Sequence, residues 1–278
     1  MSARGPMTTE EIKVAVCGAM GRMGRKVIQA ILARPGMRIT GLIEGPDCPL
    51  AGRNLNDGLG VLRPDQTLTA DFAEGARGAD VYIDFTTVPA SLAFLARAVE
   101  MKLPAVIGTT GFSRAEQAEL QEAGRHIPVL WAPNMSLGVS ALCRAAAEMA
   151  KLLGPDYDVE IVELHHRHKR DAPSGTALKL MQAVAQARGL DPDQSLVSGR
   201  QGQAGSRRED EIGVLAGRGG DVVGDHTIYF LGPGERLELT HRAHARDTFA
   251  KGAVRVAAWL VGRDPGLYTL EDTLGRPD

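Results

Sequence analysis

Cysteine is scarce in this chain, and its three cysteines, Cys17, Cys48 and Cys143, show no Cys-x-x-Cys spacing. An odd number of scattered thiols argues against both a disulfide framework and a zinc knuckle. Cys17 falls within a strand pattern and Cys143 within an alanine-rich helical pattern, where a thiol packs as a small apolar group. We therefore expect reduced, structural cysteines and no catalytic thiol.

A surplus of charge of one sign is also lacking, because 34 Asp and Glu stand against 32 Lys and Arg. This balance gives no sign of a nucleic-acid or membrane surface, so any electrostatic function must be local. No apolar run approaches membrane-spanning length, and Met1–Glu11 lacks the apolar core of a secretory signal. These absences predict a cytoplasmic protein with neither nucleic acid nor membrane as a partner.

The chain does have 278 residues that are 44% hydrophobic, enough for two domains or one large α/β unit. Residues 12–16 read as a buried strand that runs into Gly18, Gly21 and Gly24, and residues 26–33 read as a helix. Strand, glycine turn and helix in this order are typical of a dinucleotide-binding turn. Since the spacing is Gly-x-x-Gly-x-x-Gly rather than the usual Gly-x-Gly-x-x-Gly, a glycine turn without a ligand stays an alternative.

An acidic residue follows the next predicted strand. Residues 37–43 form that strand and Glu44 ends it, twenty residues beyond Gly24. A carboxylate at this distance from the glycine turn is expected to accept hydrogen bonds from an adenosine ribose. A solvated loop acid is the alternative.

Strand and helix patterns continue to alternate as far as Trp131, which predicts a parallel sheet with crossover helices. The loops that follow its strands are small and polar, and they suit close approach to a nucleotide, although each alone is also an ordinary turn. The strands are expected at 79–85, 105–107 and 127–131, the helices at 90–100 and 114–123, and the loops at 84–87, 108–111 and 132–135.

The pattern then changes to clustered strands, which marks a second domain. We expect an α/β protein with an N-terminal Rossmann-type parallel sheet at 1–134, completed by 246–278. The second domain, 135–245, is expected to be α+β with a mixed or antiparallel sheet. Its predicted elements are a helix at 137–153, strands at 158–164, 211–216, 221–231 and 235–240, and a polar loop at 198–210; a helix at 248–261 packs back on the first domain.

The segment from Glu163 to Thr176 gathers histidines and cations before a predicted helix. Val159, Ile161 and Leu164 are expected on the buried face of the preceding strand, and Glu160 and Glu163 on its polar face. Ser174 is a suitable N-cap, so the backbone N–H groups of residues 174–176 should face an anion. A solvated turn and a metal site are alternatives, but the interleaved lysine and arginines would repel a dication.

Taken together, several motifs resemble those of the dihydrodipicolinate reductase family, and the resemblance covers almost the whole chain. They include the glycine turn at residues 16–25, Gly-Thr-Thr-Gly-Phe at 108–112, Ala-Pro-Asn-Met-Ser at 132–136 and Thr-Phe-Ala-Lys-Gly-Ala-Val-Arg at 248–255. The most specific is His-His-Arg-His-Lys followed by Asp-Ala-Pro-Ser-Gly-Thr, within 165–176.

The resemblance implies reduction of 4-hydroxy-tetrahydrodipicolinate to tetrahydrodipicolinate, with loss of water, by NADH or NADPH in lysine and diaminopimelate synthesis. It implies a dicarboxylate substrate, a homotetramer built through the second domain, and no metal. His165 and Lys169 match the acid–base pair, without a decision as to which donates, and His166, Gly175 and Thr176 match positions that hold substrate. The matched cofactor positions are Gly18, Ala19, Met20, Gly21, Arg22, Met23, Glu44, Gly108, Thr109, Thr110, Ala132, Pro133, Asn134 and Met135.

One departure from the family pattern bears on the cofactor. Some members have an arginine after the ribose-binding acid, whereas this chain has Gly45. Glu44 without that cation favours NADH, although Arg22 could reach a 2′-phosphate. Two other functions stay open: a related NAD-dependent dehydrogenase of an amino acid or imine, and a dinucleotide sensor without catalysis.

Overall fold

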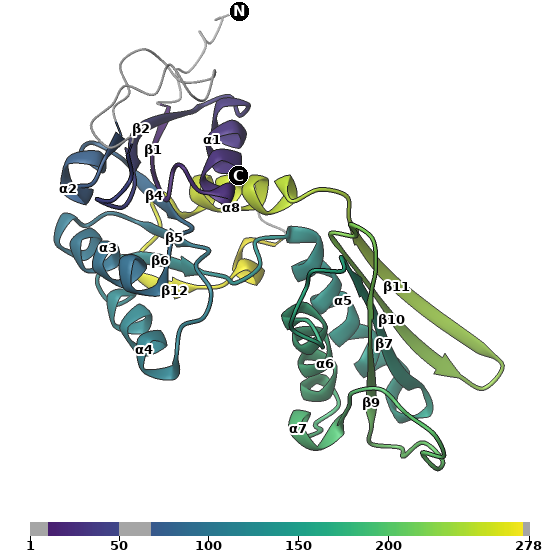
Figure 1. Cartoon of the computed structure of the whole chain (residues 1–278). Coiled ribbons are helices and arrows are strands. Elements are labelled where there is room, and N and C mark those ends of the chain that lie inside the picture. The colour runs from purple at the N-terminus through teal and green to yellow at the C-terminus, as the bar shows by residue number, and fades with distance from the viewer. Residues whose placement is uncertain (1–10, 50–67, 275–278) are drawn as a thin grey trace, which may run out of the picture. The chain divides into compact units, whose positions relative to one another are not determined.

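The computed structural model describes residues 11–49 and 68–274. They form two compact units, one comprising residues up to Met135 together with those from Asp247 onward, the other comprising Ser136–Arg246 (Figure 1). Most of the segment in which we found no signal core, residues 1–10, lies outside the described part. Among the described helices, none is long and apolar enough to cross a membrane.

The first unit is built on a seven-stranded sheet in which every pairing is parallel, as predicted. Its strand order is β12-β6-β5-β4-β1-β2-β3. The centre of the sheet is fully buried, because helices cover both faces and its strands are short runs of Val, Ile, Ala and Leu. The strands are β1 (Ile12–Cys17), β2 (Met37–Ile43), β3 (Leu68–Thr69), β4 (Val81–Asp84), β5 (Ala105–Ile107), β6 (Pro128–Trp131) and β12 (Gly266–Tyr268).

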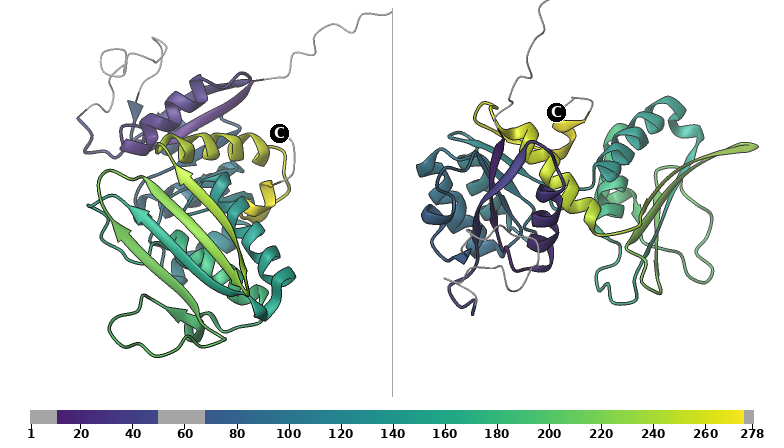
Figure 2. Two further views of the ribbon diagram at one scale, coloured as in Figure 1. Left: turned by 90° about the vertical axis from the view of Figure 1, so that its right-hand side faces the viewer. Right: turned by 90° about the horizontal axis from the view of Figure 1, so that it is seen from above.

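Two groups of helices cover this sheet, as the right-hand view of Figure 2 shows. Helices α1 and α8 pack together on one face, and α3 lies between α2 and α4 on the other. Helix α1 begins four residues earlier than predicted, because Gly21 is its N-cap and the turn before it is tight. The helices are α1 (Arg22–Leu32), α2 (Phe72–Gly75), α3 (Val88–Met101), α4 (Arg114–Ala123) and α8 (Asp247–Leu260), with a 3₁₀ turn at Leu270–Thr273.

The second unit has a mixed five-stranded sheet of order β11-β10-β7-β9-β8. Strand β10 runs antiparallel to β7 and β11, while β7, β9 and β8 are parallel. Helices α5 and α6 pack together and bury one face of the sheet. The elements are α5 (Leu137–Leu153), a 3₁₀ turn (Gly154–Asp156), β7 (Asp158–His165), α6 (Gly175–Ala187), α7 (Pro192–Ser195), β8 (Leu196–Val197), β9 (Ile212–Arg218), β10 (Gly224–Gly232) and β11 (Glu235–Ala243).

Strand β7 corrects one expectation. Val159, Ile161, Glu163 and His165 share its buried face, whereas Leu164 is 45% exposed. Strict alternation along a strand requires this arrangement, since residues two apart lie on the same side. Grouping Leu164 with the buried residues and Glu163 with the polar ones was therefore wrong.

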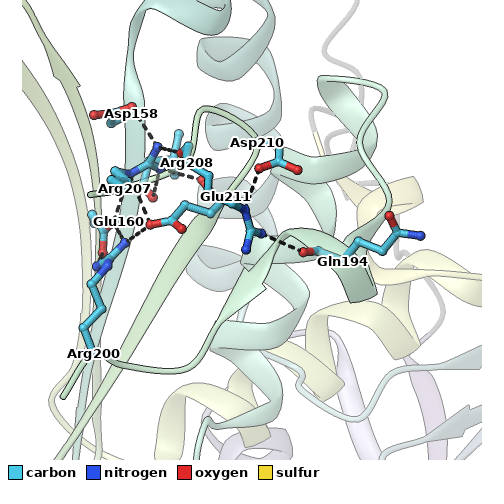
Figure 3. Close-up of polar contacts among 9 residues, drawn as sticks. Asp158, Glu160, Gln194, Arg200, Arg207, Arg208, Asp210 and Glu211 are labelled. Atoms are coloured by element: carbon cyan, nitrogen blue, oxygen red, sulfur yellow. Dashed lines mark hydrogen bonds and ion pairs between the residues drawn. The ribbon is translucent and has the colours of Figure 1, made fainter. Parts of the chain in front are cut away.

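The loop predicted at 198–210 contains no helix or strand, but arginines anchor it to the sheet (Figure 3). Arg200 donates to both oxygens of Glu160, at 3.1 and 2.8 Å, and also to Glu211. Arg207 donates to Asp158 at 2.8 Å. Hydrogen bonding from Arg200 is the main reason that the pKa of Glu211 lies below its usual value. The loop thus has a fixed path over strands β7 and β9.

Candidate active site

A cavity of about 430 Å³ lies in the first unit, where the loops after β4, β5 and β6 meet the start of α1. Of the predicted cofactor positions, eight line it: Arg22, Met23, Gly108, Thr109, Thr110, Pro133, Asn134 and Met135. Phe85 and Thr86 come from the loop after β4, and Phe249 comes from α8. Six predicted positions are not part of its lining: Gly18, Ala19, Met20, Gly21, Glu44 and Ala132.

The glycine turn is closed by direct backbone packing. Gly18 has a φ of 70°, a conformation that favours glycine. A Cβ built on Gly24 would lie only 2.0 Å from the carbonyl oxygen of Gly18. Only glycine lets α1 start this close to the end of β1, which is the packing role of the third glycine in dinucleotide-binding turns.

The start of α1 suits an anion. Its N-cap, Gly21, has no side chain to cap the helix, and the first turn holds no acidic residue. The first backbone N–H groups of a helix have no intrahelical acceptor, and the helix dipole favours negative charge there. A pyrophosphate group therefore fits this end of the cavity.

Glu44 braces the turn from the neighbouring strand. Its Oε2 accepts a hydrogen bond from the backbone N–H of Met20 at 2.8 Å, and its Oε1 accepts from Gly45 at 3.2 Å. The carboxylate is thereby fixed just beyond β2, where a ribose acceptor is expected.

Asp84 joins two of the cavity loops by hydrogen bonds. Its side chain accepts from the backbone N–H of Thr86 and from the hydroxyl of Thr109, both at 3.0 Å. Asp84 is fully buried, and burial raises its pKa above the usual value, against the opposing effect of these hydrogen bonds. Trp131 adds a third tie by donating to the backbone oxygen of Thr109 at 3.1 Å.

A cluster of titratable groups occupies the end of β7 in the second unit. His165, 8% exposed, contacts Oε2 of Glu163 through its Nδ1. The other carboxylate oxygen of Glu163 accepts from the backbone N–H of Ser174 at 3.0 Å and from Arg218 at 3.1 Å. Burial lowers the pKa of His165, and the charge of Glu163 partly opposes this effect.

Lys169 lies in the loop after β7 and binds Asp171. Its Nζ is 2.8 Å from each carboxylate oxygen, and this hydrogen bonding is the main cause of the lowered pKa of Asp171. Arg218 also donates to the backbone oxygen of Asp171 at 2.6 Å. The predicted acid–base pair therefore sits on two segments that share Arg218 as a support.

The start of α6 confirms one expectation and corrects another. Ser174 is the N-cap, and its hydroxyl accepts from Ala177 at 3.2 Å. Its backbone N–H, however, donates to Glu163 and is not available to a ligand. Gly175 and Thr176 are the first two residues of the helix. Of the three backbone groups predicted to face an anion, that of Ser174 is therefore already used within the protein.

His226 on β10 was missed by the sequence reasoning, which had no signal to relate it to His165. Its ring lies edge-on to His165 with centroids 5.1 Å apart, and its Nε2 is 3.2 Å from the hydroxyl of Ser174. Burial is the main cause that lowers its pKa to about 4.

Glu163, His165 and His226 form a group, within the described part of the chain, whose donor atoms lie close enough to hold a metal ion. Both oxygens of Glu163 already have protein partners, including Arg218. A dication would also meet the positive charge of that arginine. We therefore interpret the cluster as a hydrogen-bonded network.

His166, the predicted substrate contact, follows β7 directly. Its Nδ1 is buried without a hydrogen-bond partner in the described part of the chain, and its Nε2 is 3.4 Å from Arg246. A buried polar atom without a partner is uncommon in proteins. The role of His166 in holding substrate stays a prediction.

The parallel sheet, the glycine turn and the polar cavity at the carboxyl edge define a nicotinamide-dinucleotide-dependent oxidoreductase. The family model for the N-terminus of dihydrodipicolinate reductase matches residues 12–135 of this sequence. The family model for the C-terminus matches residues 138–274. This chain belongs to the dihydrodipicolinate reductase family.

Individual proteins show the same relationship. The 4-hydroxy-tetrahydrodipicolinate reductase of Magnetococcus marinus is 50% identical over 264 residues, covering 95% of this chain and 98% of the relative. That of Syntrophotalea carbinolica is 48% identical over 266 residues, covering 95% and 99%. The dipicolinate-bound dihydrodipicolinate reductase of Paenisporosarcina sp. TG-14 shares the fold, with a TM-score of 0.76, 24% identity, and coverage of 95% and 100%.

Proposed function

We propose that this chain reduces 4-hydroxy-tetrahydrodipicolinate to tetrahydrodipicolinate, with loss of water, using NADH or NADPH. The observation that carries this proposal is the placement of His165. A nearly buried imidazole, held by Glu163, lies beside the start of α6 and the loop of Lys169. The curated relatives that carry this enzyme name are nearly half identical over almost the whole chain. We infer that the first unit binds the dinucleotide and the second the substrate.

The substrate is a cyclic dicarboxylate, which fits the charges of the second unit. One carboxylate can lie at the start of α6, where the helix dipole favours negative charge and where Gly175 and Thr176 match the substrate positions of the family. His166, whose Nδ1 has no partner in the described part of the chain, can bind the other, with Arg246 beside it. Binding at both ends would hold the ring between them.

Bound NADH or NADPH supplies the hydride. After water leaves the hydroxylated ring, the hydride adds to a conjugated carbon and the electron pair moves toward the ring nitrogen, where one proton is taken up. His165 or Lys169 supplies that proton as general acid. His165 is the nearly buried group of the two and Lys169 is paired with Asp171, so His165 is the donor that we test first.

The dinucleotide that we favour is NADH. Glu44 is fixed at the end of β2, and Gly45 offers no cation to a 2′-phosphate. Arg22 lines the cavity and is the cation that could offset this effect. Steady-state kcat/KM with each dinucleotide tests the preference, and equal values would contradict it.

We further propose that the second unit mediates self-association into a homotetramer. Helices α5 and α6 bury the face of its sheet that carries Val159 and Ile161. The opposite face carries Leu164 and Leu215, which are 45% and 40% exposed. Exposed apolar side chains on the sheet face opposite the helices are typical of a subunit contact. Sedimentation velocity measures the assembly, and a monomer at micromolar concentration would contradict it.

The deciding experiment follows NADH and NADPH oxidation with substrate generated freshly from pyruvate and aspartate semialdehyde by the preceding synthase. We expect turnover that depends on the synthase and disappears in His165→Ala. Dinucleotide binding without turnover would indicate a sensor, and turnover with a monocarboxylate imine in place of the dicarboxylate would indicate a different dehydrogenase.

A further inference from the structure

Glu163 is a carboxylate in an unusual position. Its side chain is completely buried on the face of β7 that also carries Val159 and Ile161, in the hydrophobic core of the second unit. A buried carboxylate is costly unless its oxygens are fully hydrogen-bonded. A hydrophobic residue would fill this position at lower cost, so the reason for an acid must lie in its partners.

Those partners belong to three different segments of the candidate site. Oε2 contacts Nδ1 of His165, on the same strand. Oε1 accepts from the backbone N–H of Ser174, the N-cap of α6, at 3.0 Å. It also accepts from Arg218 at 3.1 Å, and Arg218 in turn donates to the backbone oxygen of Asp171 at 2.6 Å. One carboxylate thus ties together the histidine, the helix start and the loop that carries Lys169.

We infer that Glu163 is a positioning residue that keeps the proton of neutral His165 on Nδ1 and leaves Nε2 as the atom that exchanges the reacting proton. The inference rests on the proposed reductase function. An ionised carboxylate only accepts hydrogen bonds, so the ring nitrogen that it contacts must be the donor. The same arrangement fixes the tautomer and the ring orientation of histidines in catalytic triads.

The other end of the ring is kept accessible by the neighbouring strand. A Cβ built on Gly224 of β10 would lie 2.9 Å from Nε2 of His165 and 3.3 Å from its Cδ2. Any side chain at this position would therefore crowd Nε2. The two ring nitrogens of His165 therefore have different surroundings: Nδ1 contacts the carboxylate of Glu163, and Nε2 faces Gly224.

The charges around His165 predict how its titration responds to loss of the carboxylate. The titratable and charged groups that face it are Glu163 on its own strand, Lys169 in the following loop, Arg218 on β9 and His226 on β10. Only Glu163 among them stabilises the imidazolium form. Neutralising it must lower the pKa of His165 and reduce the protonated fraction at working pH.

The test compares Glu163→Gln with Glu160→Gln. Both positions are on β7, but Glu160 lies on the opposite face and binds Arg200, at 3.1 and 2.8 Å, rather than His165. We expect Glu163→Gln to lower kcat by roughly 100-fold, with little change in the dinucleotide KM. The alkaline limb of its kcat/KM profile should move to lower pH. Glu160→Gln should keep the wild-type profile.

Nitrogen-15 NMR of histidine-labelled protein reads the tautomer without any activity. Above the pKa of His165, the wild-type signal should show a protonated Nδ1, and Glu163→Gln should shift the population toward a protonated Nε2; His165→Gln identifies the signal. A wild-type histidine protonated on Nε2 would overturn the inference even if the variant fails to fold. So would an unchanged tautomer and pH profile in a folded Glu163→Gln. Failure of the wild type to turn over substrate would instead count against the proposed function.

Discussion

The two units place their charged side chains in opposite ways. In the first unit the cavity has little charge. Among the residues that the structure describes, Arg22 is the one charged member of its lining, and the buried acid Asp84 lies outside the lining and holds two of the loops that form it. In the second unit the titratable groups themselves gather, with Glu163, His165 and His226 buried against one another. This contrast is the basis of our proposal that the first unit binds the dinucleotide and that the second transfers a proton.

The difference also separates what each unit requires of its residues. A dinucleotide site needs close backbone approach and an anion-binding helix start, which glycine and short loops provide. Proton transfer needs one group of defined orientation and tuned pKa, which only neighbouring charges and burial provide. Substitutions in the two units should therefore change different measured quantities.

The largest effect is expected for His165→Ala. Removing the proposed proton donor should lower kcat by about 10²- to 10⁴-fold, the usual contribution of general acid catalysis, while the Kd of the dinucleotide changes little. Lys169→Ala should lower kcat and also raise the KM of the substrate, because the variant loses a cation beside the anion site. Stopped-flow turnover and fluorescence titration with NADH measure these quantities. A His165→Ala variant that loses dinucleotide affinity as much as kcat would break the division between the units.

The pH dependence of stability should have opposite signs in the two units. Burial lowers the pKa of His226 from 6.5 to about 4, so the unfolded chain binds its proton more readily and the second unit loses stability as pH falls from 6.5 toward 4. At about 1.4 kcal/mol per pKa unit, the loss approaches about 3 kcal/mol. Burial raises the pKa of Asp84, so protonation at low pH stabilises the first unit. Lowered pKa values of His165 and His241 act in the same direction as His226.

Hydrogen exchange with mass spectrometry, corrected for intrinsic rates, can follow both units between pH 6.5 and 4.5. Peptides from α6 and β10 should lose protection, while those from β4 and β5 should keep or gain it. In His226→Gln the change of exchange protection with pH should become smaller in the second unit and should stay the same in the first. An equal change of protection with pH in the two units would contradict the opposite pH dependence that we expect.

The sequence predicted the first unit almost completely because its features are local. Strand, glycine turn and helix follow one another along the chain, and the bounds of β2, β5 and α4 agree with the structure. Five short elements were missed, because each has only two to four residues, too few to show a period. They are β3, α2 and β12 in the first unit, and α7 and β8 in the second. They form because neighbouring strands and helices provide partners, not because of their own sequence.

In the second unit, the sequence predicted His165 and Lys169 but missed their supports. Glu163 was assigned to the wrong face of β7 because Leu164 looked like a core residue. His226 and Arg218 are separated from His165 by more than fifty positions, and only the pairing of β7 with β9 and β10 brings them together. Strict two-residue alternation from Val159 through Ile161 was the available signal for Glu163.

A smaller effect, on the free energy of unfolding, should distinguish the closely packed glycine turn of the first unit from a glycine position of the second unit. In Gly24→Ala the new Cβ meets the backbone oxygen of Gly18 at 2.0 Å, and backbone cannot move aside. Overpacking of this kind costs about 1–3 kcal/mol, partly offset by the better helix propensity of alanine. In Gly219→Ala, in the second unit, the new Cβ meets no heavy atom of the described residues within 4 Å. We expect a net loss of about 2 kcal/mol for the first variant and less than about 1 kcal/mol for the second, measured by urea unfolding. Equal losses would show that the turn of the first unit is not more rigid.

The smallest effect concerns the choice between NADH and NADPH, which we test at one position of the first unit, Gly45. A Cβ built on Gly45 meets no heavy atom of the described residues within 4 Å, so Gly45→Arg can start a side chain beside Glu44 without a clash at its Cβ. A charge-assisted contact to an exposed 2′-phosphate should raise kcat/KM for NADPH by several-fold to roughly tenfold, and leave kcat with NADH nearly unchanged. Gly45→Gln, of similar length but uncharged, is the matched control, and the gain should shrink as salt is added. A gain that is equal in both variants would show that the charge of the arginine is not its cause. A lower kcat with both dinucleotides would show that this strand end also affects the chemistry and that binding and proton transfer are not divided between the units.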